Sequence, residues 1–138
     1  MKKILIAEDE GHIARLIVFK LEREGYEVTW ARDGGEVFKI LENFTPDLVI
    51  LDVMMPVMDG FEVLKKIKSD EKLKNISVIM LTSKSQDRDI TEGFELGVDD
   101  YIIKPFRPAE LVARVKNAMI AFFIPVLSIF PQVFFPTI

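Results

Sequence analysis

The chain of 138 residues has no cysteine, and it has only one histidine and one tryptophan. The lack of cysteine excludes disulfides and thiolate metal sites and fits a cytoplasmic location. A surplus of positive charge is also absent, because 22 acidic and 18 basic side chains give a net charge of -4. This balance argues against direct binding to nucleic acid. The apolar run within the first residues, MKKILIAEDE, is too short for a signal peptide.

Ionisable side chains are missing from residues 118–138, AMIAFFIPVLSIFPQVFFPTI. We therefore divide the chain into a domain of residues 1–121 and an uncharged tail of residues 122–138, rich in proline and phenylalanine. The uncharged stretch is long enough to span a bilayer, but three prolines each remove a helical hydrogen-bond donor: Pro125, Pro131 and Pro136. We expect the last helix to end just before Pro125. We expect the tail to pack on another copy of the chain or on the domain's own surface. A membrane anchor and a truncated end in place of a lost output domain are the alternatives.

Five short apolar runs alternate with five stretches of helical periodicity. The runs are residues 3–7, 27–31, 47–51, 77–81 and 101–103. The helical stretches are residues 10–24, from the Asp33 cap to about Phe44, from Gly60 onward, 86–96, and the segment that begins near Pro108. No hairpin signal joins consecutive strands, so the pattern predicts an α/β fold with a parallel sheet covered on both faces. Alternation in residues 27–31, EVTWA, predicts an edge strand.

Polar side chains follow these runs at the points where the predicted strands end. Glu8 and Asp9 follow the first run, Asp52 the third, Thr82 and Ser83 the fourth, and Lys104 the fifth. The carboxyl ends of parallel strands meet at one rim of a sheet, where ligands of such folds bind. Each residue alone has a simpler interpretation, as a helix cap or a solvated surface group. Their coincidence at successive strand ends favours a shared site.

The predicted site combines several carboxylates with one ammonium group. Glu8, Asp9 and Asp52 would repel one another without a counterion, and one lysine cannot neutralise three acids. Mg²⁺ binds through oxygen atoms and suits one or two carboxylates together with a phosphate. A metal, a carboxylate, an ammonium and a hydroxyl group fit phosphoryl transfer, in which an aspartate acts as the nucleophile.

Four motifs in this order, EDE, LDVMMPVMDG, MLTS and YIIKPF, resemble the receiver domain of two-component response regulators. The resemblance covers about residues 1–121. It implies a flavodoxin-like, doubly wound sheet of five parallel strands in the order 2-1-3-4-5, with five flanking helices. It also implies a signalling function. A sensor histidine kinase would transfer a phosphoryl group from its phosphohistidine to Asp52 with the help of Mg²⁺, and hydrolysis would later remove it.

The resemblance also assigns individual roles around the metal. Asp52 would be the phosphoacceptor and a metal ligand, and Asp9 would bind Mg²⁺ directly. Glu8 would act nearby or through water. Met54 would contribute its backbone carbonyl to the metal. Gly60 would permit the loop after Asp52 to turn.

Further roles concern the phosphoryl oxygens and the switch. Thr82 would hydrogen-bond one phosphoryl oxygen, and Lys104 would pair with another and precede a cis proline, Pro105. Tyr101 would be the switch aromatic that turns inward when Thr82 moves. The added charge would bias the face formed by the helix 86–96, the strand 101–103 and the last helix between two states.

The segment DDYIIKPFRPAELVARV further resembles receivers that carry winged-helix DNA-binding domains and pair through this same face. Asp100, Glu110 and Arg114 match charged positions of that interface. Ile90 stands where a basic residue is usual, and Arg88 is left open as its substitute. A homodimer through this face or through the tail is therefore a hypothesis. We expect no direct binding to nucleic acid, because no DNA-binding domain follows.

Two other functions compete with signalling. A Mg²⁺-dependent phosphatase with an aspartate nucleophile generally needs a second acid two residues later, where this chain has Met54. A flavin-binding module would need a loop rich in Gly, Ser and Thr after the first strand, where EDEGHIA places acids. We therefore expect a signalling module that acts as a catalyst only on its own aspartyl phosphate. The phosphatase is kept as the alternative.

Overall fold

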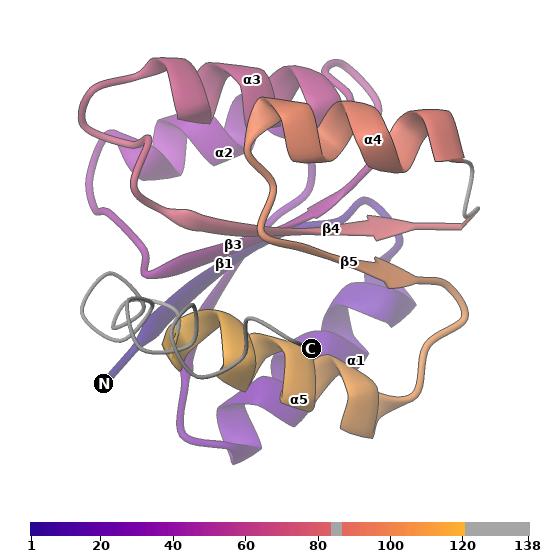
Figure 1. Ribbon diagram of the computed structural model, residues 1–138. Helices are drawn as coiled ribbons and strands as arrows, with labels where there is room; N and C mark the ends of the chain where they lie inside the picture. The colour runs from indigo at the N-terminus through magenta and orange to yellow at the C-terminus, as the bar shows by residue number, and fades with distance from the viewer. Residues whose placement is uncertain (84–86, 121–138) are drawn as a thin grey trace, which may run out of the picture.

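The computed structural model describes residues 1–83 and 87–120, which form a parallel sheet between two layers of helices (Figure 1). The strands are β1 (Lys3–Ala7), β2 (Glu27–Ala31), β3 (Leu48–Asp52), β4 (Ser77–Thr82) and β5 (Asp100–Ile103). They pair in the order β2-β1-β3-β4-β5, and every pairing is parallel. The predicted α/β, flavodoxin-like sheet is confirmed.

Five helices cover this sheet. They are α1 (Gly11–Arg23), α2 (Gly34–Leu41), α3 (Gly60–Ser69), α4 (Asp87–Leu96) and α5 (Pro108–Ile120). Helices α2, α3 and α4 lie on one face, and α1 and α5 lie on the other (Figure 1). Helix α2 is shorter than predicted, because it ends at Leu41 and not at Phe44. Pro46 follows closely and disfavours helical backbone in the residue before it, so the chain leaves the helix through a turn.

The helix ends use the signals that the sequence contains. Asp33 caps α2, with its Oδ1 accepting a hydrogen bond of 2.9 Å from the backbone N–H of Glu36. Asp59 caps α3 in the same way, at 3.0 Å from the N–H of Glu62. Gly25, which follows α1, adopts a φ of 95°, a left-handed conformation that favours glycine. These caps fix where each helix begins after its strand.

The central strands are buried along their whole length. Every residue of β3 and β4 is buried, as expected for parallel strands covered on both faces. Leu48 and Ile50 of β3 pack with the α1 and α5 layer, whereas Val49 and Leu51 pack with the α2, α3 and α4 layer. In the register of β1 with β3, Ala7 lies opposite Leu51. Glu8, the residue after β1, and Asp52, the last residue of β3, therefore lie side by side at the rim of the sheet.

Some expectations fall outside what the structure describes. They concern the tail of residues 122–138, the end of α5 relative to Pro125 and the side chain of Arg88. Within the described residues, no helix combines the length and the apolar character that crossing a membrane requires.

Candidate functional site

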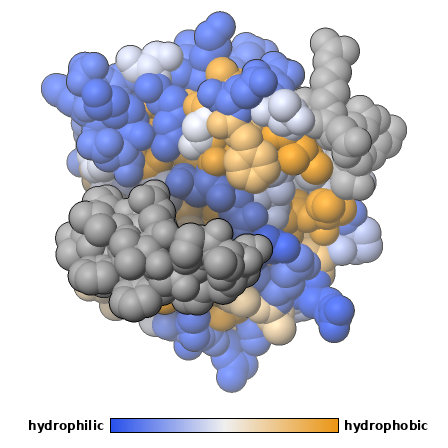
Figure 2. Space-filling model, in the orientation of Figure 1, coloured by the Kyte–Doolittle hydropathy of each residue, from blue (hydrophilic) through white to orange (hydrophobic). Residues whose placement is uncertain are grey.

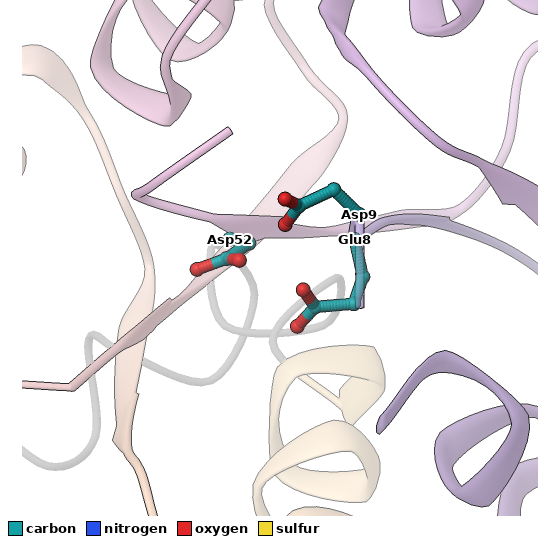
Figure 3. Close-up of side chains that lie close together, drawn as sticks. All are labelled: Glu8, Asp9 and Asp52. Carbon is teal, nitrogen blue, oxygen red and sulfur yellow. The ribbon is translucent and has the colours of Figure 1, made fainter. Parts of the chain in front are cut away.

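Three carboxylates meet where β1 and β3 end. Glu8, Asp9 and Asp52 each offer an oxygen atom, and these atoms all lie within 4.8 Å of one another. Figure 3 shows Glu8 and Asp9 extending from one segment beside Asp52. Glu8 is fully buried and Asp52 is 3% exposed, whereas Asp9 is exposed. The strand-end argument therefore placed all three acids correctly.

Lys104 supplies the positive charge at this site. Its Nζ lies 2.9 Å from Oε1 of Glu8 and 3.2 Å from Oδ2 of Asp52. Glu10 is more distant, with its Oε1 at 4.0 Å. The Lys104–Pro105 peptide bond is cis, as the resemblance implied. Lys104, which follows β5, thus bridges Glu8, which follows β1, and Asp52, which ends β3.

Thr82 and Tyr101 lie on the neighbouring strands. Thr82 is the buried last residue of β4, and its carbonyl accepts a hydrogen bond of 2.7 Å from the N–H of Lys104. Tyr101 is 7% exposed, so its side chain is already inward in this structure. Its ring meets the ring of Phe94 edge to face, with the centroids 5.5 Å apart.

The backbone around Glu8 is held by residues that the sequence analysis did not select. The N–H of Glu8 donates to the carbonyl of Ala31 at 3.1 Å, and the indole N–H of Trp30 donates to the carbonyl of Glu8 at 2.7 Å. The N–H of Glu10 donates to Oε2 of Glu8 at 3.1 Å. The edge strand β2 therefore fixes the loop that carries two of the three acids. The alternating pattern of residues 27–31 predicted an edge strand that contains Trp30, but it did not predict the contact of Trp30 with Glu8.

The loop after Asp52 is tightly folded. The N–H of Met54 donates to Oδ1 of Asp52 at 3.3 Å, and the N–H of Gly60 donates to the carbonyl of Val53 at 2.9 Å. A Cβ at Gly60 would lie 2.5 Å from the carbonyl oxygen of Asp52. Glycine is required there for close approach, because any side chain would collide with the backbone of Asp52.

Val57 is the strained residue of this loop. Its φ is 71°, and the N–H of Met58 donates to the carbonyl of Pro56 across it at 2.7 Å. A β-branched residue with positive φ in this narrow turn costs on the order of 1–3 kcal/mol. Val57 is 84% exposed, so its side chain contributes little packing in return.

Val57→Gly is therefore expected to raise the free energy of unfolding by about 1 kcal/mol, after the extra chain entropy of glycine is subtracted. Urea denaturation followed by circular dichroism measures this change. Met54→Gly is the matched control, because Met54 is 72% exposed in the same loop but has no positive φ. The control should lower stability. A lower stability of Val57→Gly would contradict the strain.

Burial and crowding change the protonation of the site. Burial, followed by a hydrogen bond with Asp52, raises the pKa of Glu8 from 4.5 to about 7, although Lys104 opposes the shift. Burial disfavours the charged form of Lys104, but its contacts with Glu8 and Asp52 outweigh this and raise its pKa. Near neutral pH, Glu8 therefore holds a proton about as readily as it releases it.

The site fits a hard divalent cation. Oε1 of Glu8 is buried and, among the described residues, has no partner in hydrogen-bonding geometry, although the ammonium of Lys104 lies near it. All three clustered side chains offer carboxylate oxygens, the atoms that Mg²⁺ prefers. A cation at this point would offset the negative charge of the clustered carboxylates.

The raised pKa predicts a dependence of stability on pH. Glu8 has a pKa of about 7 in the folded chain and ordinarily 4.5. Between these two pH values the folded state holds a proton on Glu8 that the unfolded state has released. The contribution of Glu8 to the free energy of unfolding should therefore fall by about 3 kcal/mol as the pH rises through this window. It is measured by urea denaturation in EDTA, as the difference between the wild type and Glu8→Gln. A difference that does not change with pH would contradict the shift.

Comparison with known proteins identifies the family. The sequence matches the response regulator receiver domain over residues 4–116. The alkaline phosphatase synthesis transcriptional regulatory protein PhoP of Bacillus subtilis (strain 168) is 47% identical over 115 residues, which are 83% of this chain and 47% of that protein. The probable transcriptional regulator ycf27 of Cyanophora paradoxa is 43% identical over 118 residues, or 86% of this chain and 48% of that protein. The chain thus spans about half the length of these relatives.

Solved structures agree with this match. The signal receiver domain of a signal transduction histidine kinase from Syntrophus aciditrophicus superposes with a TM-score of 0.80 and 38% identity, over 86% of this chain and 90% of that one. The chemotaxis response regulator CheY4 of Vibrio cholerae gives a TM-score of 0.81 and 32% identity, over 86% and 98%. With its parallel five-stranded sheet and the acids gathered at the strand ends, the chain belongs to the response regulator receiver domain family of two-component signalling.

Proposed function

We propose that this chain receives a phosphoryl group on Asp52 from the phosphohistidine of a sensor histidine kinase in the cytoplasm. The observation that carries the proposal is the position of Asp52. Its carboxylate is almost fully buried, lies 3.2 Å from the ammonium of Lys104 and shares a rim with Glu8 and Asp9. A carboxylate in such a place is costly for the fold and is useful as a nucleophile.

The transfer forms one bond and breaks one. An Oδ atom of Asp52 attacks phosphorus, the bond from phosphorus to the histidine nitrogen breaks, and that nitrogen keeps the electron pair. Lys104 pairs with one phosphoryl oxygen, and the hydroxyl of Thr82 donates to another. Mg²⁺, when bound, supplies positive charge that compensates the phosphoryl oxygens and the acids. Attack of water on phosphorus later returns Asp52 and inorganic phosphate.

The same arrangement supports a set of metal ligands. Asp9 and Asp52 would coordinate Mg²⁺ directly, Met54 would add its backbone carbonyl, and Glu8 would act from the buried side. Glu8 is tied to Lys104 at 2.9 Å, which supports an indirect role for its carboxylate. The aspartyl-nucleophile phosphatase gains no support, because Met54 stands at the position of the second acid and is 72% exposed.

The output surface is the α4–β5–α5 face, which we propose as the site of homodimer formation after Thr82 and Tyr101 respond to the phosphate. Phe94 and Ile103 are 52% and 43% exposed, and Figure 2 shows hydrophobic residues gathered on the surface over α4 and β5. Arg114 pairs within its own chain with both oxygens of Asp100, at 3.0 and 2.9 Å, and with Glu110 at 3.2 Å. A dimer through this face would have to exchange these partners between chains.

Incubation with acetyl phosphate and Mg²⁺, followed by intact mass spectrometry, tests the proposed function. The expected result is an increase by the mass of one phosphoryl group, which base removes. EDTA in place of Mg²⁺ should suppress the adduct. A chain that remains unmodified with Mg²⁺ and a purified donor kinase would refute the proposal.

A further inference from the structure

A glycine interrupts α4 at a position where the backbone does not require one. Gly93 is buried in the helix interior, and the glycines with positive φ in the described chain are Gly25 and Gly97. Glycine is less favourable than alanine inside a helix, because it loses more conformational freedom on folding. The missing side chain therefore needs a reason in packing.

Tyr101 of β5 supplies this reason. A Cβ placed on Gly93 would lie 2.7 Å from Cζ of Tyr101 and would overlap with its hydroxyl oxygen. The ring of Phe94, the next residue of α4, meets the Tyr101 ring edge to face. The phenol of Tyr101 thus occupies a notch in α4 that even a methyl group at position 93 would fill.

The backbone of α4 cannot easily move away from the ring. Gly97 ends the helix with a φ of 103°, and its N–H donates to the carbonyl of Phe94 at 3.1 Å. The N–H of Val98 donates to the carbonyl of Gly93 itself at 2.9 Å. Asp99 then joins β4 through a bond of 2.8 Å to the carbonyl of Val78. Since this cap fixes Gly93, a collision at the notch has to be relieved by movement of the Tyr101 side chain.

We propose that Gly93 is a positioning residue: because it has no side chain, the Tyr101 ring can occupy its inward place against α4. A methyl group at position 93 would collide with the ring and hold it outward. The notch rests on geometry alone. Its consequence for signalling, that residue 93 sets how readily Tyr101 turns inward after phosphorylation, rests on the function proposed above.

A double-mutant cycle on stability tests the notch without phosphorylation. In the wild type, Gly93→Ala should lower the midpoint of urea denaturation, because the methyl group collides with the Tyr101 ring. In the Tyr101→Ala background the same substitution should raise the midpoint, because the ring is absent and alanine is more favourable than glycine inside a helix. Glu92→Ala, at the exposed neighbouring position of α4, is the control and should shift both backgrounds equally. Equal shifts from Gly93→Ala in both backgrounds would overturn the proposal. If Gly93→Ala does not fold, a folded Gly93→Ala/Tyr101→Ala supports the notch and an unfolded one refutes it.

The position of the ring can be measured directly. The chain has two tyrosines, so incorporation of 3-fluorotyrosine gives two ¹⁹F resonances, and Tyr26→Phe identifies that of Tyr101. Gly93→Ala should move the ¹⁹F chemical shift of Tyr101 toward the value of free 3-fluorotyrosine. The resonance should also shift between H₂O and D₂O, as it does for a ring that is exposed to solvent. A resonance that stays buried in Gly93→Ala would overturn the proposal. If the acetyl phosphate adduct on Asp52 is absent while both readouts behave as expected, the proposed function fails and the notch stands.

Discussion

Asp52→Asn is expected to abolish the acetyl phosphate adduct completely. An amide oxygen is a poor nucleophile and cannot form a stable acyl phosphate, so the loss should be total and not a reduced rate. The substitution keeps the size of the side chain, and the asparagine oxygen can still accept the hydrogen bond of 3.3 Å from the N–H of Met54. The fold should therefore persist, and with one charge fewer beside Glu8 the metal-free protein should become more stable. Intact mass spectrometry and urea denaturation measure the two effects.

Asp59→Asn is the matched control for this experiment. Asp59 lies in the same loop, but its carboxylate caps α3 at 3.0 Å from the N–H of Glu62, a role that asparagine performs equally well. It should therefore form the adduct at the rate of the wild type. An adduct that survives in Asp52→Asn would show that another carboxylate, such as Asp9, accepts the phosphoryl group.

Lys104→Met should destabilise the metal-free protein by about 3–5 kcal/mol at about pH 8. The lysine side chain is 13% exposed, and it is the cation next to buried Glu8 and Asp52. Methionine retains most of the apolar stem, so the loss reports the charge and not the packing. Below about pH 5 the effect should shrink, because Glu8 then carries a proton. Urea denaturation at both pH values measures the difference.

Saturating Mg²⁺ should restore much of this stability, since a cation at the acids replaces the missing charge. Affinity for Mg²⁺ should be kept or strengthened in Lys104→Met, while phosphorylation no longer changes the α4–β5–α5 face. Lys116→Met serves as a control, because Lys116 pairs with Glu24 at 2.9 Å on the surface and its removal should change little. A Lys104→Met protein that loses Mg²⁺ binding would assign the lysine a different role.

The sequence predicted the location of the acids because it depends on topology. Parallel strands put their carboxyl ends at one rim, and the strand order 2-1-3-4-5, which the family resemblance implied, makes Asp52 and Glu8 neighbours there. Lys104 followed by the same argument. The protonation of the cluster could not be predicted from the sequence. The burial of Glu8 and its raised pKa depend on tertiary packing, which no local sequence pattern encodes.

Other features depend on contacts between distant segments. The hydrogen bond from Trp30 to Glu8 joins two strands through their register, and the collision at Gly93 involves a residue on the next strand. Pro46 signals that α2 ends early, but the prediction followed the helical periodicity to about Phe44, whereas the helix ends at Leu41. Arg114, matched by resemblance to an interface between chains, pairs with Asp100 within the chain, a contact that the sequence analysis did not predict.

Trp30 gives the molecule an intrinsic optical reporter. It is the sole tryptophan of the chain, its indole N–H is bound to the carbonyl of Glu8, and the guanidinium of Arg32 lies 4.9 Å from the centre of its ring. Any event that shifts the Glu8 segment alters the polarity around this fluorophore. Its emission can therefore follow the occupancy of the acidic rim in real time, without a label and without a substitution near the chemistry.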